Sequence, residues 1–138
     1  CRPRSPGGRA RTCRRSCCLL VGTDDSLADI VEFFGLLRAG LTTPEIPPGC
    51  LVVNDMAAGS EPDAARRYVE LLQRGLQAAL GRAATAGSID RASVDRRSRL
   101  LVTSVIGINL ISRHATSNDE ITAMVDAAIA EVRSWAVA

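Results

Sequence analysis

Residues 100–111 read LLVTSVIGINLI, and this stretch decides the fold. Its polar side chains, Thr103, Ser104 and Asn109, are spread around a helix instead of gathering on one face. A helix that is apolar all round must be covered on more than one side. The stretch spans about 18 Å as a helix, well short of the ~20 residues that cross a bilayer. We therefore expect burial in the protein's own core and against a second copy, with no membrane contact.

A β-strand is the alternative for this stretch, because Val, Ile and Thr are common in strands. The run lacks clean alternation of polar and apolar residues, and it is longer than the roughly 4–8 residues of a typical strand. The sequence therefore favours a helix, although periodicity alone does not decide it.

Two stripes divide the surface of this expected helix. The first follows the i, i+3, i+4, i+7 spacing of one helix face and contains Ser104, Gly107, Ile108 and Ile111. A glycine inside a helix costs roughly 1 kcal/mol relative to alanine, so close approach of another backbone would explain Gly107. The second stripe is expected to face the rest of the chain and contains Val102, Val105, Ile106 and Asn109.

The next helix begins at a capping box. The Ser117 hydroxyl is expected to accept the backbone N–H of Glu120, whose carboxylate reaches back. Apolar residues then recur at helical spacing at Ile121, Met124, Val125, Ala128, Val132 and Trp135. The short polar link 114–116 predicts an antiparallel pair of helices. The predicted homodimer interface on this pair comprises Ser104, Gly107, Ile108, Ile111, Val125, Ala128 and Val132.

The remaining segments also predict helices. An amphipathic helix is expected over 23–40, capped by Thr23 or Asp24 and ended by Gly40. The prolines of 41–49 predict a loop. Residues 50–59 are expected to form a short buried helix. A long helix is expected over 60–87, and Gly87 ends it. The charged run 95–99 reads as a solvated first turn of the next helix. The predicted fold is an all-α antiparallel bundle of about five helices over 23–138.

The charge distribution separates residues 1–22 from the rest. They hold six arginines and no acid, whereas 23–138 hold eleven arginines against fifteen acids, a balance of −4. The larger part has no basic face for nucleic acid, and 3% aromatic residues leave little for stacking on bases. A DNA-binding function is therefore not expected of 23–138 by itself.

Residues 1–22 are expected to be disordered, because Pro, Gly and Arg dominate and no apolar period appears. An arginine-rich arm for nucleic acid and a misassigned start are the alternatives. A zinc site is poorly supported, since the spacing of Cys13, Cys17 and Cys18 is not that of a structural zinc site. The apolar run 19–21 is too short for a secretory signal, so the expected location is the cytoplasm.

The sequence lacks the residue sets of common enzymes. It has no Gly-rich phosphate loop, no paired His and Cys ligands and no Ser/His/Asp set. Cys50 has no base to activate it nearby, because the single histidine is His114. We expect neither enzymatic activity nor a metal or other cofactor.

The order of these segments resembles a known family. A helix, a Pro-rich loop, the phrase PGCLVVN at 48–54, a long Ala/Leu/Arg helix, the break AGSID at 86–90 and the final pair of helices follow one another. This order is similar to the C-terminal ligand-binding and dimerisation domain of TetR-family bacterial transcriptional repressors. The resemblance covers residues 24–136, and its most specific part is 49–54.

The resemblance implies an effector-binding regulator that dimerises through its last two helices. In that family an N-terminal helix-turn-helix head reads operator DNA, and residues 1–22 show no trace of such a head. The effector would be a small apolar molecule. The pocket residues expected on this basis are Phe34, Leu37, Leu51, Asn54, Tyr68, Leu72, Leu76, Val102 and Asn109. A helical homodimerisation module without a ligand is the alternative, and a small helical enzyme is a more distant one.

Overall fold

The structure is a computed structural model, and it describes residues 26–44, 59 and 62–136. All regular secondary structure in these ranges is helical: α2 (Ser26–Thr42), α4 (Pro62–Thr85), a 3₁₀ turn η1 (Arg91–Ser93), α5 (Val94–Ile111) and α6 (Asn118–Ser134). The all-α prediction is confirmed. The described ranges contain four α-helices rather than about five, and the short helix expected at 50–59 lies outside them, as do residues 1–22.

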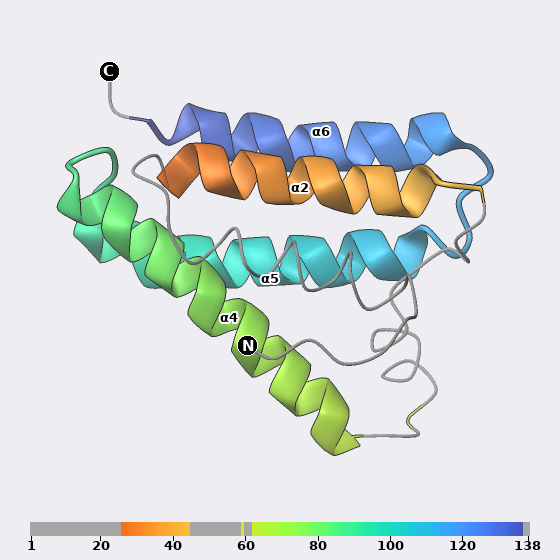
Figure 1. The fold of residues 1–138 in the computed structure, drawn as a ribbon, viewed down its shortest axis with the longest axis horizontal. Helices are drawn as coiled ribbons and strands as arrows, with labels where there is room; N and C mark the ends of the chain where they lie inside the picture. The colour runs from red at the N-terminus through yellow and green to blue at the C-terminus, as the bar shows by residue number, and fades with distance from the viewer. Residues whose placement is uncertain (1–25, 45–58, 60–61, 137–138) are drawn as a thin grey trace, which may run out of the picture.

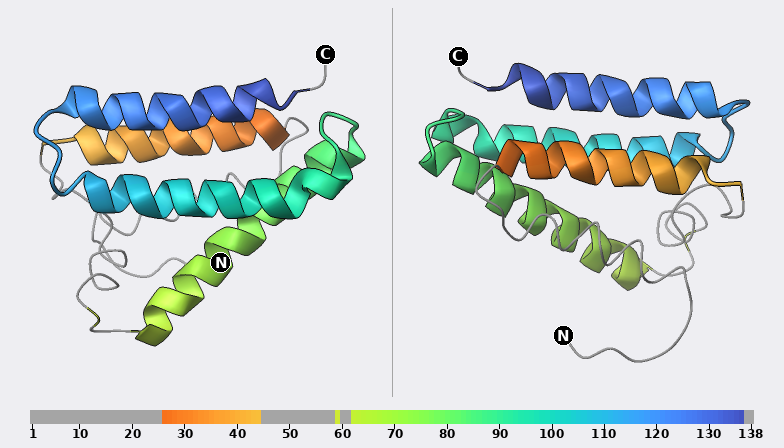
Figure 2. Two further views of the ribbon diagram at one scale, coloured as in Figure 1. Left: turned by 180° about the vertical axis from the view of Figure 1, so that it is seen from behind. Right: turned by 45° about the horizontal axis from the view of Figure 1, so that its top comes forward.

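Three of the helices run side by side, and the fourth crosses them. α5 and α6 are antiparallel, and α2 lies along α6 in the opposite direction (Figures 1 and 2). α2 packs mainly on α6 and also on α4, and α4 packs along the first part of α5. The amino-terminal half of α4 diverges from the other three helices (Figure 1). The predicted pair of helices therefore forms, but its second arm packs more closely on α2 than on α5.

The core lies where these four helices meet. Phe34 is fully buried and Phe33 packs edge-on against it, with 5.5 Å between the ring centroids. Burial of an apolar side chain of this size stabilises a fold by about 1.5–3 kcal/mol. On α4 the apolar side chains that face the core are Leu72, Leu76, Ala79, Leu80 and Ala83, all of which are buried. These residues recur at helical spacing, so one face of α4 lies against the core.

Local signals set two of the helix ends as expected. Gly87 has φ +77° and follows the last turn of α4, where Ser88 N–H donates to the Ala83 carbonyl at 2.9 Å. This is the glycine-dependent end that the sequence predicted. At the start of α6 the Ser117 hydroxyl accepts the Glu120 N–H at 3.3 Å. The Glu120 carboxylate accepts the Thr116 N–H instead of the Ser117 N–H, at 3.0 Å.

Two local expectations were wrong. Gly40 does not end α2, which continues to Thr42, because a glycine ends a helix only where its φ turns positive. The run 95–99 is not simply solvated, since Ser98 is fully buried and accepts a hydrogen bond from Gln73 of α4 at 2.8 Å. η1 precedes this run, with Asp90 accepting the Ala92 N–H at 3.0 Å.

Candidate functional site

The outward side of the α5–α6 pair carries an apolar surface that we call the hairpin face. On α5 it contains Leu100 and Ile111, which are 42% and 47% exposed, with the half-buried Ser104 and Gly107 between them. These positions follow one another at i, i+4, i+7 and i+11, which is one line along a helix. Two large apolar side chains are thus partly exposed at the two ends of this line, with the small Ser104 and Gly107 between them.

α6 contributes the exposed Ala127 and Glu131 to the hairpin face, with Met124 and Ala128 half-buried beside them. Ala123, Ala127 and Ala130 are exposed. The α2 side of α6 is marked by Asp126, whose carboxylate accepts a hydrogen bond from Arg38 of α2 at 2.6 Å. Ala123 and Ala130 lie three residues before and four residues after Asp126, so they are on the α2 side of α6, whereas Ala127 is closer to the α5 side. Figure 2, left, shows α2 between the ribbons of α6 and α5, in agreement with the closer packing of α6 on α2.

Gly107 sits at the middle of the hairpin face. A Cβ placed on it would meet no heavy atom within 4 Å, so no described part of the same chain requires a glycine there. The same is true of Gly35 and Gly81, so an open glycine is not unusual in this chain. What distinguishes Gly107 is its place between the exposed Leu100 and Ile111.

The seven predicted interface residues fall into two groups. Ile111 is exposed, and Ser104, Gly107 and Ala128 are half-buried. Ile108, Val125 and Val132 are buried in the core of the single chain, at 6%, 0% and 0% exposure. They lie in the cluster that the four helices enclose, so their side chains do not reach the hairpin face.

The predicted effector residues mostly belong to the core. Phe34, Leu72, Leu76 and Val102 are buried among other apolar side chains. Leu37 and Tyr68 are half-buried at the edge of this core, on α2 and α4. Leu51 and Asn54 lie outside the described residues. The structure therefore brings six of the nine into one apolar cluster.

Asn109 is buried but already hydrogen-bonded within its own helix. Its side-chain Nδ2 donates to the Val105 carbonyl at 2.8 Å, and the Ser112 hydroxyl donates to the Asn109 carbonyl at 2.8 Å. A buried amide paired in this way carries little desolvation cost. Nδ2 has one donor engaged inside the helix, which reduces what the side chain can offer a ligand.

Two shallow depressions lie away from the predicted effector residues. One is near the end of α4 and is lined by Ala78, Gly81, Arg82, Thr85, Ala86 and Arg91. The other lies between α2 and the end of α6 and is lined by Leu27, Ala28, Val31, Glu32, Ser88, Val132, Arg133 and Ala136. Neither contains a residue of the predicted effector set.

Sequence reasoning missed one contact between the two arms of the hairpin. The Arg97 guanidinium of α5 stacks on the Trp135 ring that follows α6, with Cζ 4.8 Å from the ring centroid. Trp135 Nε1–H donates to the Glu131 carboxylate at 2.9 Å. Antiparallel packing brings the start of one arm to the end of the other, so the pairing was recoverable from the predicted hairpin.

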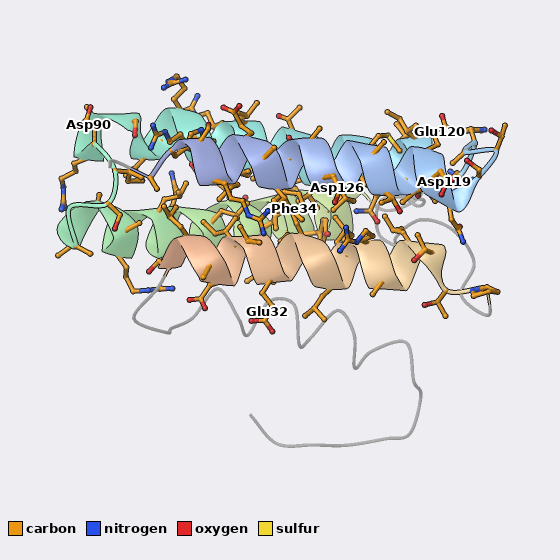
Figure 3. All side chains as sticks on the ribbon, turned by 90° about the horizontal axis from the view of Figure 1, so that it is seen from above. Glu32, Phe34, Asp90, Asp119, Glu120 and Asp126 are labelled. Atoms are coloured by element: carbon orange, nitrogen blue, oxygen red, sulfur yellow. The ribbon has the colours of Figure 1, made fainter. Side chains whose placement is uncertain are left out.

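The described ranges contain no group of three His, Cys, Asp or Glu side chains placed to hold a metal, and all five cysteines lie outside them. Among the described helices none combines the length and apolarity needed to span a bilayer. Figure 3 shows Asp119, Glu120 and Asp126 along α6, distributed over its surface instead of converging on one point. No protein-family model, curated protein or solved structure matches this chain.

Proposed function

We propose that this chain is the dimerisation domain of a TetR-like transcriptional regulator, and that the hairpin face is its self-association surface. The observation that carries the proposal is the line of exposed Leu100 and Ile111 with Gly107 between them, on the α5 side that adjoins α6. Contiguous exposed apolar surface on a small protein marks an interaction site. An apolar surface on a pair of antiparallel helices suits a second identical pair.

The size of the hairpin face bounds the strength of such a dimer. α5 and α6 have 18 and 17 residues, so each is about 26 Å long and about 10 Å across with its side chains. Two copies would thus bury on the order of 1,000 Å² in total, which is the lower limit for a specific interface. We expect a dimer that dissociates on dilution, rather than one whose subunits fold only together.

A matched pair of substitutions tests the self-association surface. Leu100→Asp places a charge on the hairpin face and should give a monomer that keeps its helical circular dichroism, because Leu100 is already partly solvated. Leu71→Asp is the control, since Leu71 is 55% exposed on α4 and away from this face. Light scattering in line with size-exclusion chromatography should find the control dimeric. Equal masses for Leu100→Asp and the unmodified chain would exclude the hairpin face as the self-association surface.

Effector binding is the second part of the proposal, and it rests on the resemblance and on the edge of the apolar core. Leu37 and Tyr68 are half-buried over the buried Phe34 and Leu72. An apolar ligand would enter there by displacing side chains at this edge, and the predicted residues Leu51 and Asn54 would add to the site. Operator recognition is not assigned to any described residue.

Close packing of the core favours the alternative, a dimerisation module without an effector. Phe34 and Leu76 are completely buried among other side chains, and the Asn109 amide is paired within its own helix. Thermal unfolding with a panel of fatty acids and planar aromatic acids separates the two functions. An effector present at 100 times its Kd stabilises the fold by about 2.7 kcal/mol. Tyr68→Ala should remove that shift and Leu71→Ala should not. If no ligand raises the unfolding temperature, the result would support a dimerisation module without an effector.

A further inference from the structure

The exposed side of α5 carries no charge from residue 100 to residue 111. Each of the other described α-helices does carry charge on its exposed side, for example at Glu32 on α2, Arg74 on α4 and Asp126 on α6. A solvated helix face normally carries charged side chains, so an uncharged and partly apolar one indicates a contact with a partner. The uncharged face of α5 consists of the exposed Leu100, Thr103, Leu110 and Ile111 and the half-buried Ser104 and Gly107.

Side-chain size varies along this face. Leu100 and Ile111 are the large side chains at its two ends, and the small Ser104 and Gly107 lie between them. The Ser104 hydroxyl donates to the Leu100 carbonyl of its own helix at 2.9 Å, so it needs no acceptor in a partner. Two crossing helices are closest at the crossing point and diverge on either side of it. The face therefore fits a helix that crosses it at Ser104 and Gly107, while the large side chains fill the diverging ends.

The order of large and small residues along this line is the same in both directions. Measured from the midpoint between residues 105 and 106, Leu100 and Ile111 are equally far away, and so are Ser104 and Gly107. In a two-fold dimer the same patch of both copies meets itself, so the patch must be complementary to itself. A second α5, antiparallel to the first, meets this condition. Leu100 then lies near the partner's Ile111, and Ser104 lies near the partner's Gly107.

Charge favours an antiparallel crossing over a parallel one. Arg96 lies four residues before Leu100 on the same line, is exposed, and has no ion-pair partner among the described residues. A parallel crossing would set Arg96 near the partner's Arg96, and the two like charges would repel each other. An antiparallel crossing sets it toward the carboxyl end of the partner's α5, where the helix dipole is negative.

Contact of α5 with the partner's α6 is less favourable. The side of α6 that adjoins α5 carries the exposed Glu131, whose carboxylate accepts a hydrogen bond from Trp135 Nε1–H at 2.9 Å. Leu100 or Ile111 placed over this carboxylate would remove water from a charged group and offer no donor in return. A second α5 brings no charged group over 100–111, so its burial carries no such cost.

We infer that α5 of one copy crosses α5 of a second copy in the antiparallel direction, with Ser104 and Gly107 at the crossing, an inference that rests on the proposed dimer. The missing Cβ of Gly107 allows the two helix axes to approach to about 8 Å, the short end of the usual range. α5 then forms the centre of the interface, and α6 lies at its edge. The second copy gives Gly107 a purpose that the single chain does not, since a Cβ there would meet no heavy atom of the same chain within 4 Å.

Cysteine cross-linking tests the crossing and its direction. The five natural cysteines are first replaced by serine in the full chain, and circular dichroism and sedimentation check that this chain remains a helical dimer. A disulfide needs Cα atoms within about 7 Å of each other, so only a position at the crossing can form one with its own copy. Under mild oxidation Ser104→Cys should therefore form a covalent dimer, with loss of the single-chain band. Ala78→Cys, exposed on α4, is the control and should stay a single chain.

The ends of the face give the direction. Leu100→Cys and Ile111→Cys should be joined to each other by a short thiol-reactive linker when the two variants are mixed, and neither should be joined to its own copy. Leu100→Cys that cross-links with its own copy, but not with Ile111→Cys, would overturn the antiparallel direction. A dimeric serine-substituted chain in which Ser104→Cys does not cross-link would overturn the crossing of α5 and leave the dimer intact.

A second measurement keeps the natural cysteines. Gly107→Leu places a large side chain at the crossing and should raise the dimer Kd measured by sedimentation equilibrium, whereas Gly81→Leu on α4 should not. Equal Kd values for Gly107→Leu and the unmodified chain would overturn the crossing. An unmodified chain that is monomeric would instead overturn the proposed dimer itself.

Discussion

The Arg97 guanidinium lies over the indole ring of Trp135, with Cζ 4.8 Å from the ring centroid, and it joins the start of α5 to the end of α6. A cation–π contact of this kind contributes about 0.5–2 kcal/mol. Within the described residues, Nε and Nη1 of Arg97 are buried and have no hydrogen-bond partner. The contact therefore combines a favourable stacking with two unpaired donors.

The first prediction follows from this balance. Arg97→Met should leave the free energy of unfolding unchanged or raise it by up to about 2 kcal/mol, because the stem still packs and the unpaired donors disappear. Trp135→Ala should lower it by about 3–5 kcal/mol, since the ring is 7% exposed and leaves a cavity. Urea unfolding followed by circular dichroism provides both values. A loss of more than about 1 kcal/mol in Arg97→Met would mean that the stacking on Trp135 outweighs the cost of the two unpaired donors.

The second prediction concerns the polar contact between α4 and α5. Gln73 Nε2 donates to the Ser98 hydroxyl at 2.8 Å, and Ser98 has no exposed surface. A double-mutant cycle with Gln73→Ala and Ser98→Ala should give a coupling of about 0.5–1.5 kcal/mol. Strictly additive losses would show that the two side chains do not stabilise each other.

The third prediction compares a glycine at the end of α4 with one inside it. Gly87 has φ +77°, so Gly87→Ala should lower the free energy of unfolding by about 1–2 kcal/mol. Gly81 lies inside α4, and a Cβ placed on it would meet no heavy atom within 4 Å, so Gly81→Ala should raise it by about 0.5–1 kcal/mol. Thermal unfolding of both variants checks the opposite signs. A higher free energy of unfolding for Gly87→Ala would contradict the positive φ of Gly87.

The fourth prediction uses Gly107, which is as open as Gly81 within the single chain. Gly107→Ala should likewise raise the stability of the dilute monomer by about 0.5–1 kcal/mol. If the partner's helix packs on this position, the added methyl group should also raise the dimer Kd, whereas Gly81→Ala should not. Unfolding at low concentration and sedimentation at high concentration separate the two effects. An unchanged Kd would remove Gly107 from the interface.

Local signals in the sequence predicted much of the fold. Ser117 and Gly87 identified helix ends because a side-chain cap and a positive φ act within a few residues. The apolar period of 121–135 identified the inner face of α6 in the same way. Gly40 was misjudged because a glycine is compatible with a helix, and packing of α2 on α6 decides that the helix continues.

The neighbours of each face were harder to predict than the faces themselves. Val125 and Val132 lie on the apolar stripe of α6, but a period does not say whether a stripe meets the same chain or another copy. They lie in the core shared with α2, which is distant in sequence and packs on α6. Ser98 was likewise hidden inside a charged run, and only the position of Gln73 on α4 reveals its burial. Long-range packing therefore decides which predicted residues stay available for a partner.

The central claim is that the hairpin face joins two copies, and the mass of the unmodified chain in solution tests it most directly. Sedimentation equilibrium over a range of concentrations should give twice the 14.6 kDa of one chain at the upper end and fall toward 14.6 kDa on dilution. Ile111→Asp should remain at the single-chain mass throughout with unchanged helical circular dichroism, because Ile111 is 47% exposed in the monomer. A single-chain mass for the unmodified protein at every concentration, or a dimer that Ile111→Asp does not weaken, would contradict the claim.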